Sequence, residues 1–180
     1  MADSIPEFEI TDGIGKKTFI FNTGPITGAT ATGTKSLAYL FHGSGITQKY
    51  KLVKIIVDQI AGNNGAMRIE LNRITAEAGT PGGTLATIQP KLNGDTSSAV
   101  ARFNPTNAPT RQPGTLFGVG SDPKMNGQTY PCGGLSGDDL DAIPWTIDPS
   151  TAFGYEVTQV VTATISTAPT FNVTFEWTEE

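Results

Sequence analysis

Tyr50-Lys51-Leu52-Val53-Lys54-Ile55-Ile56-Val57-Asp58-Gln59-Ile60 and, after a short connection, Met67-Arg68-Ile69-Glu70-Leu71-Asn72-Arg73-Ile74 decide the fold of this chain. In the second segment, apolar and polar residues alternate, and this period of two is typical of a strand with one buried face. Between the segments, Asn64-Gly65 supplies residues that tolerate the positive φ of a tight turn. The pattern therefore predicts a long β-hairpin over residues 50–74.

The first of these segments also carries apolar residues on its more polar side. Ile55 and Ile56 must point to opposite faces of the strand. Either the strand lies centrally in a sandwich, or another chain covers its outer face. Ile56, Ile60 and Val160, on the more polar faces of their strands, are therefore candidates for a contact between subunits. Coverage by the protein's own domain explains the same pattern equally well.

Composition favours a single all-β domain. The chain has 180 residues, of which 16% are charged, 21 are Gly and 12 are Pro. This balance is typical of many strands joined by turns, and the length is that of one domain. The net charge of −5 and the scattered Lys and Arg argue against a nucleic-acid partner. The lone cysteine, Cys132, excludes an internal disulfide framework and a multi-cysteine zinc site.

The chain lacks the signals of a membrane or secreted protein. No apolar run approaches the ~20 residues that a membrane-spanning helix needs. The N-terminus does not show the basic and then apolar pattern of a signal peptide. We therefore expect a soluble protein that is made in a cytoplasm and has no membrane partner.

Further strands follow from the same alternation. Residues 1–17 form a predicted N-terminal arm, whose apolar residues Ile5, Phe8 and Ile10 would dock on the chain's own domain or on a neighbour. Residues 18–180 form one predicted domain, which ends in a second hairpin with an aromatic inner stripe at Phe171, Phe175 and Trp177. The other predicted strands are 18–22, 37–42, 85–88, 99–103 and 115–119. Eight or nine strands predict a two-sheet antiparallel sandwich of jelly-roll type with long loops.

No catalytic or phosphate-binding constellation is recognisable. Residues 28–36 resemble a phosphate-binding loop, but Thr34 separates Gly33 from Lys35, and the residues that follow are not helical in pattern. A Gly/Thr-rich loop is the preferred interpretation. His42 lies near Ser44 without the spacing of a nucleophile elbow. We therefore expect a protein that is not an enzyme and that needs no cofactor.

Two loop features allow binding interpretations. Asp138, Asp139 and Asp141, with Asp148 or Asp122, could hold calcium, but their spacing lacks the alternating ligands of a calcium loop, so we favour a solvated acidic loop and predict no metal. Separately, Tyr130 and Trp145 lie in or beside loops. They could stack on a sugar, although aromatic residues at subunit interfaces give the same pattern.

Several stretches resemble small virion proteins of tailed bacteriophages. The first is Arg68-Ile69-Glu70-Leu71-Asn72-Arg73-Ile74-Thr75-Ala76-Glu77-Ala78-Gly79-Thr80. Others are Pro90-Lys91-Leu92-Asn93-Gly94-Asp95, Ala99-Val100-Ala101 and the closing Phe175-Glu176-Trp177-Thr178. The resemblance covers about residues 37–178, and neither the arm nor residues 121–141 have a counterpart in that family.

The resemblance implies a jelly roll that forms trimers on the phage head or in its fibres. We therefore expect a decoration or cement protein that binds the major capsid protein on the outer surface of the virion and associates with itself as a homo-trimer. The arm residues Ile5, Phe8 and Ile10 would contact the capsid or an adjacent subunit. The alternative is a carbohydrate-binding sandwich module of a phage fibre, with Tyr130 and Trp145 as stacking platforms.

Overall fold

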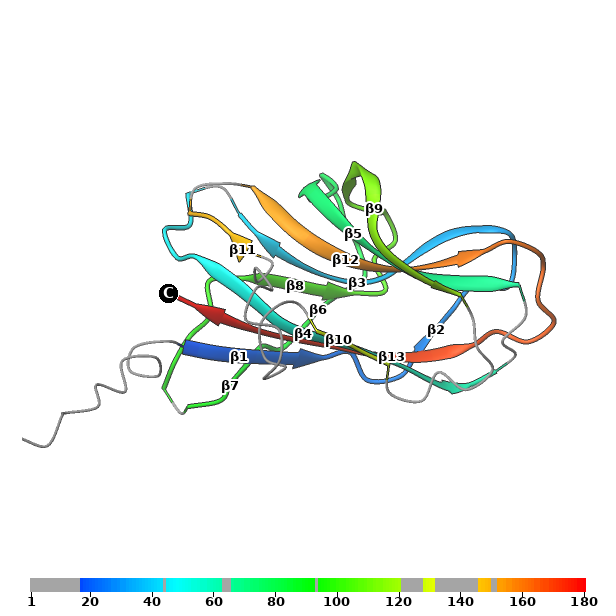
Figure 1. The fold of residues 1–180 in the computed structure, drawn as a ribbon, viewed down its shortest axis with the longest axis horizontal. Coiled ribbons are helices and arrows are strands. Elements are labelled where there is room, and N and C mark those ends of the chain that lie inside the picture. The colour runs from blue at the N-terminus through cyan, green and yellow to red at the C-terminus, as the bar shows by residue number, and fades with distance from the viewer. Residues whose placement is uncertain are drawn as a thin grey trace, which may run out of the picture.

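The computed structural model describes residues 17–43, 45–62, 66–92, 94–120, 128–131, 146–149 and 152–180, and of 115–120 and 128–131 it describes the backbone. All regular structure in these residues is β (Figure 1). None of them forms a helix, so the described part of the chain has no helix that could cross a membrane. The strands are β1 (Lys17–Asn22), β2 (Ile26–Thr27), β3 (Gly33–His42), β4 (Tyr50–Ala61), β5 (Met67–Ala76), β6 (Thr84–Leu85), β7 (Gln89–Pro90), β8 (Val100–Phe103), β9 (Thr110–Gly120), β10 (Gln128–Pro131), β11 (Thr146–Ile147), β12 (Phe153–Val161) and β13 (Thr170–Glu179).

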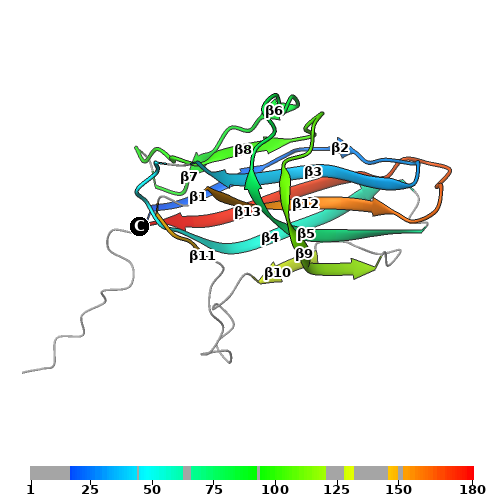
Figure 2. The ribbon, with the colours of Figure 1, turned by 90° about the horizontal axis from the view of Figure 1, so that it is seen from above.

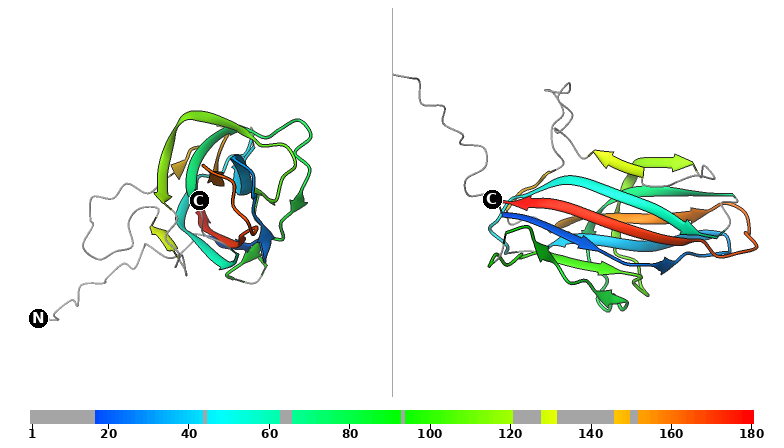
Figure 3. Two further views of the ribbon diagram at one scale, coloured as in Figure 1. Left: turned by 90° about the vertical axis from the view of Figure 1, so that its right-hand side faces the viewer. Right: turned by 90° about the horizontal axis from the view of Figure 1, so that it is seen from below.

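These strands form two antiparallel sheets that pack face to face, as the sequence predicted. The seven-stranded sheet has the order β10-β4-β13-β1-β7, with β11 also paired to β4 and β2 to β13. The six-stranded sheet has the order β6-β8-β3-β12-β5-β9. Figure 2 shows the six-stranded sheet from its outer side, and the left view of Figure 3 looks along the sandwich, with the two layers around a common interior.

The predicted hairpin over residues 50–74 is wrong, although both of its strands exist. β4 pairs with β13 in the seven-stranded sheet, whereas β5 pairs with β12 and β9 in the six-stranded sheet. The chain therefore crosses from one sheet to the other between them. Because of this crossing, the apolar side of β4 lies on one wall of the interior and the apolar side of β5 lies on the facing wall. The two sets of apolar side chains then shield each other from water. A hairpin would have left both apolar sides on one sheet.

The second predicted hairpin is wrong for the same reason. β12 belongs to the six-stranded sheet and β13 to the seven-stranded sheet. Its connection packs on the one between β4 and β5, because the amide nitrogen of Thr162 donates to the carbonyl oxygen of Ala66 at 2.7 Å. Gly62 (φ 94°) lies so close to Ala168 and Pro169 that a Cβ atom has no room there. The two crossings therefore brace each other at one end of the sandwich.

The predicted core residues are confirmed. Phe171, Val173, Phe175 and Trp177 of β13 are fully buried, and Met67, Ile69 and Leu71 of β5 are buried in the opposite wall. Three aromatic pairs join β1 to β13. The ring centroids lie 5.8 Å apart for Phe19 and Trp177, 5.0 Å for Phe21 and Phe175, and 6.3 Å for Phe21 and Trp177. These rings supply much of the apolar area that holds the terminal strands together.

Three strands differ from their predicted extents. The predicted strand 85–88 is wrong beyond Leu85, because β6 covers Thr84–Leu85 and residues 86–88 are not in a strand. β3 begins at Gly33 rather than Leu37, and its first residues pair with β12, with Ser36 opposite Thr158. The expected loop therefore ends at residue 32. A phosphate-binding loop would be followed by a helix, whereas the backbone from Gly33 onward is a strand. β9 begins at Thr110, before the predicted residue 115, and its pairing with β5 shifts register around Pro113 and Gly114.

We expect Gly154→Ala to destabilise the protein by about 2–3 kcal/mol, because overpacking a close contact costs this much. A Cβ atom at Gly154 in β12 would meet the carbonyl oxygen of Leu40 and lie 2.9 Å from Cγ1 of Ile74. Urea unfolding of both proteins measures the difference. Gly79→Ala is the control, since nothing lies within 4 Å of a Cβ atom there, and a similar loss in both variants would contradict the packing argument.

Candidate functional site

The three predicted subunit-contact residues lie on two opposite outer faces of the sandwich. In β4, Ile56 and Ile60 alternate with the buried Ile55 and Val57 and therefore face outward from the seven-stranded sheet. Ile56 is half-buried and Ile60 is 54% exposed. Val160 is half-buried and faces outward from the six-stranded sheet. The structure thus separates Val160 from the other two by the thickness of the molecule.

Several predicted residues lie outside the described part of the chain. These are Ile5, Phe8 and Ile10 of the arm, Trp145, Cys132, Ser44, and the loop aspartates 122, 138, 139 and 141. For Tyr130 the backbone pairs with that of Ile55. Asp148 forms an ion pair with Lys49 at 3.2 Å. In the residues that are described, no group of three or more His, Cys, Asp or Glu side chains is placed to hold a metal ion.

His42 is a core residue. Its side chain is fully buried, its Nε2 atom hydrogen-bonds to the carbonyl oxygen of Gln48 at 2.8 Å, and its ring meets that of Tyr50 edge-on at 4.4 Å. These contacts fix the imidazole inside one end of the sandwich. Their geometry is that of a structural histidine.

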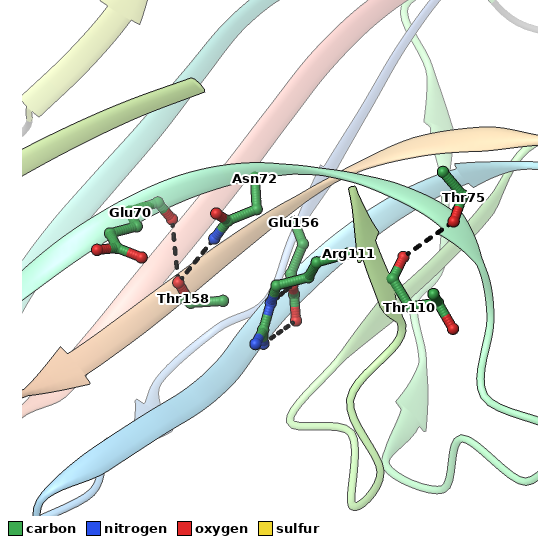
Figure 4. Close-up of polar contacts among 7 residues, drawn as sticks. All are labelled: Glu70, Asn72, Thr75, Thr110, Arg111, Glu156 and Thr158. Carbon is green, nitrogen blue, oxygen red and sulfur yellow. Dashed lines mark hydrogen bonds and ion pairs between the residues drawn. The ribbon is translucent and has the colours of Figure 1, made fainter. Parts of the chain in front are cut away.

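A buried ion pair lies on the outer side of the six-stranded sheet (Figure 4). Arg111 in β9 donates two hydrogen bonds to Glu156 in β12. One runs from Nε to Oε2 at 2.5 Å, and the other runs from a terminal nitrogen to Oε1 at 3.0 Å. Glu156 is fully buried, whereas the Arg111 side chain is 30% exposed. A bidentate guanidinium is the partner that best compensates a carboxylate removed from water. The pair therefore ties the edge strand β9 across β5 to the middle of the sheet.

Hydroxyl and amide groups extend this contact along the sheet. Asn72 donates from its side-chain nitrogen to Oγ1 of Thr158 at 3.1 Å, and the Thr158 hydroxyl donates to the carbonyl oxygen of Glu70 at 3.4 Å. Figure 4 shows these groups beside the Arg111–Glu156 pair, on neighbouring strands. Thr158 is fully buried and Asn72 nearly so. Asn72 and Thr158 thus have partners, which is the condition for burying them at low cost, whereas the buried hydroxyl of Ser36, opposite Thr158, has none among the described residues.

A third set of contacts secures the loop after β5. The Tyr39 hydroxyl donates to a Glu77 oxygen at 2.7 Å, and Nε of Arg102 lies 3.5 Å from the same oxygen. Burial, together with the neighbouring Glu77 carboxylate, raises the pKa of the Tyr39 hydroxyl well above its usual value of 10.0. Tyr39 therefore remains a neutral donor at physiological pH. The three sets of contacts together have the chemistry of a structural clasp, with each acid matched to a base or a donor.

A small cavity of about 260 Å³ lies at the end of the sandwich that holds the C-terminus. Its most buried acidic group, Glu179, accepts hydrogen bonds from both Ser97 and Ser98 and, at 3.1 Å, from the indole nitrogen of Trp177. These bonds saturate the carboxylate and fix residues 97–98 against β13. The cavity is lined by Lys17, Gln48, Thr96, Ser98, Glu179 and Glu180.

The outer side of the seven-stranded sheet carries a basic and partly apolar surface, which we call the lysine face and define as Lys51, Lys54, Lys91, Ile20 and Ile56. Both Lys54, at 3.1 Å, and Lys91 form ion pairs with one carboxylate, Glu176 of β13. Burial by itself would raise the pKa of Glu176, but the hydrogen bonds and charges of Lys91 and Lys54 outweigh it and lower the pKa below its usual value of 4.5.

Neither the Arg111–Glu156 pair nor the cluster of Glu176 with its lysines could be predicted from the sequence, because their members are far apart in the chain. Arg111 and Glu156 are separated by 45 residues, and Lys91 and Glu176 by 85. One signal was available: Glu156 and Glu176 each stand at a polar position of a strand whose other polar residues are mostly neutral. Their partners come from separate strands or loops and leave no local pattern.

Comparisons with known proteins give no family assignment: no family model matches the chain, and no similar protein was found among curated proteins or solved structures.

We expect Arg111→Ala to cost about 2–4 kcal/mol of folding free energy, because it leaves Glu156 buried without its cation. The double variant Arg111→Met with Glu156→Leu should recover most of this loss, since no uncompensated charge remains. Urea unfolding of the single and double variants measures both effects. Lys49→Ala, which breaks an ion pair whose aspartate is 67% exposed, should cost less than about 1 kcal/mol. Equal losses in the Arg111 and Lys49 variants would refute the structural role of the clasp.

The lowered pKa of Glu176 predicts a pH-dependent contribution to stability. A carboxyl group whose pKa is depressed in the folded state stabilises the protein above its usual pKa, and this contribution is lost as the pH falls from that value through the lower pKa of the folded state. The difference in unfolding free energy between wild type and Glu176→Gln should therefore be constant above about pH 6 and shrink below the usual value of 4.5. Denaturant titrations across this range measure it, with Asp148→Asn as the control. A difference that is independent of pH would contradict the ion-pair assignment.

Proposed function

We propose that the sandwich is a jelly roll and that the chain is a structural protein, not an enzyme, of a tailed-phage virion. The strand order supports the first part. Along the chain, β1, β3, β4 and β5 alternate between the sheets, as do β9, β10, β12 and β13. In each sheet, a strand of the later group (β9, β10, β12 and β13) lies between two strands of the earlier group (β1, β3, β4 and β5). The resulting orders are β10-β4-β13-β1 in one sheet and β3-β12-β5-β9 in the other. Two interleaved antiparallel sets of four strands are the mark of a jelly roll.

Its proposed role is to decorate the outer surface of the assembled head as a trimer and to stabilise it. The observation that carries this proposal is the presence of outward-facing apolar residues on both sides of the molecule: Ile56 and Ile60 on one face, Val160 on the other. A contact between unlike faces is heterologous, and such contacts close into rings when the rotation permits. A cyclic trimer uses two unlike surfaces of every subunit.

Stabilisation of the head follows from mass action. A protein that binds the assembled lattice of the major capsid protein, and not its separate subunits, lowers the free energy of the assembled state. Three linked copies raise the effective concentration of each attachment. The arm residues Ile5, Phe8 and Ile10 are proposed to contact the capsid or an adjacent subunit. The paired and buried charges of the clasp fit a rigid scaffold for such contacts.

The test measures the heat resistance of purified heads with added protein. We expect wild type to raise the temperature at which heads open. The arm variant Phe8→Asp with Ile10→Asp should bind at least about 10-fold more weakly, since two apolar contacts are lost. Leu85→Asp, at a position that is 61% exposed in β6, is the matched control and should protect like wild type. An arm variant that protects fully would remove the arm from the proposal, and a wild-type protein that does not protect heads would remove the decoration function.

A further inference from the structure

The lysine face presents positive charge although the whole chain is acidic. The side chains of Lys54 and Lys91 are 39% and 47% exposed, whereas the Glu176 side chain between them is 8% exposed. The surface therefore shows the two ammonium groups while their shared carboxylate lies beneath. Lys51 lies on the same side but is paired with Glu180 at 2.8 Å, so the net positive charge of the face comes from Lys54 and Lys91, which share one carboxylate. Against a net charge of −5 for the chain, this face is suited to an acidic partner.

Apolar side chains lie among these lysines. Ile20 of β1 lies opposite Glu176 of β13, which in turn lies opposite Lys54 of β4. Ile56 lies opposite Thr174, one row further along the sheet. Both isoleucines are half-buried. In the right-hand view of Figure 3, no described segment crosses in front of β4, β13 and β1. Ile20 and Ile56 therefore lie in adjacent rows of the sheet, two strands apart, with Glu176 and Thr174 of β13 between them.

The sequence that precedes β1 has the complementary composition. Residues 1–16 contain Asp3, Glu7, Glu9 and Asp12 against a single cation, Lys16. Within them, Glu7-Phe8-Glu9-Ile10 alternates between acidic and apolar residues, which is the period of two of a strand with one apolar side. An extended segment of this kind can set Phe8 and Ile10 toward Ile20 and Ile56. The ammonium groups, at the ends of long flexible stems, can then rise beside it to meet the carboxylates.

We propose that residues 5–12 of one copy bind as an extended segment on the lysine face of the next copy. Phe8 and Ile10 pack on Ile20 and Ile56, and the Glu7 and Glu9 carboxylates pair with lysines of that face. This inference rests on the trimer of the proposed function and names the surface that receives the arm. Residues 13–16, which include Gly13 and Gly15, connect this segment to β1 and span up to about 14 Å when extended. An arm that binds the unlike surface of a neighbour is a heterologous contact, which is compatible with a closed ring.

Disulfide trapping in the full-length chain tests the contact. In a Cys132→Ser background, Phe8→Cys is combined with Ile56→Cys, and after mild oxidation the products are separated without reductant. We expect covalent oligomers that end at the trimer. The matched control combines Phe8→Cys with Leu85→Cys, which is well exposed but lies in the other sheet, and it should yield monomer. Phe8→Cys with Ile20→Cys tests the same contact at a second position, should the first pair fail to fold.

Charge is tested in the same assay. Adding Glu7→Gln and Glu9→Gln to the trapping variant should slow cross-linking about 5-fold at low salt, the loss expected for two surface ion pairs. Three outcomes would overturn the inference. The cross-links could form within one chain, or the pair with Ile56→Cys could cross-link no better than the pair with Leu85→Cys. The third outcome is that neither Ile56→Cys nor Ile20→Cys cross-links with Phe8→Cys. Light scattering of the unoxidised protein separates the two proposals. A monomer contradicts the proposed trimer, whereas a trimer without the cross-link contradicts only the arm contact.

Discussion

Each long strand of this protein has one apolar side, and the fold depends on setting these sides against each other. A single sheet cannot do so, because all of its apolar side chains would face water together. By crossing between sheets after β3, β4 and β12, the chain places successive apolar sides on facing walls. Phe175 and Trp177 from one wall then share an interior with Met67 and Ile69 from the other. The aromatic pairs between β1 and β13 extend this burial to the two ends of the chain.

The period of two was enough to predict the strands and their buried sides, but it could not identify their partners. Alternation tells which side of a strand is apolar, and this side is the same in a hairpin and in a crossing between sheets. Asn64-Gly65 predicts a turn in both cases. The partners of β4 and β5 are set by residues more than a hundred and more than eighty positions away, such as Phe175 opposite Ile55 and Val157 opposite Leu71. Only the folded chain brings these residues together.

The same limit applies to the charged clusters. Glu156 could be recognised as an acidic residue in a strand of the sandwich, yet nothing near it in the sequence pointed to Arg111. The early part of β3 was missed because Gly33, Thr34 and Lys35 are polar or small, and pairing with β12 rather than local preference makes them extended. In contrast, Ile56, Ile60 and Val160 could be assigned to outward positions from alternation alone, and the structure adds that they lie on opposite sides of the molecule.

The antiparallel pairing of β1 with β13, in which Lys17 lies opposite Glu179, has a consequence for biosynthesis. The first strand of the sandwich can join its sheet only after the last one has left the ribosome. At a synthesis rate of about 5–20 residues per second, Phe19 and Phe21 wait roughly 10–30 seconds for Phe175 and Trp177. During that time the nascent chain has an unpaired, aromatic strand near its leading end. Completion of this sheet therefore waits for the synthesis of β13.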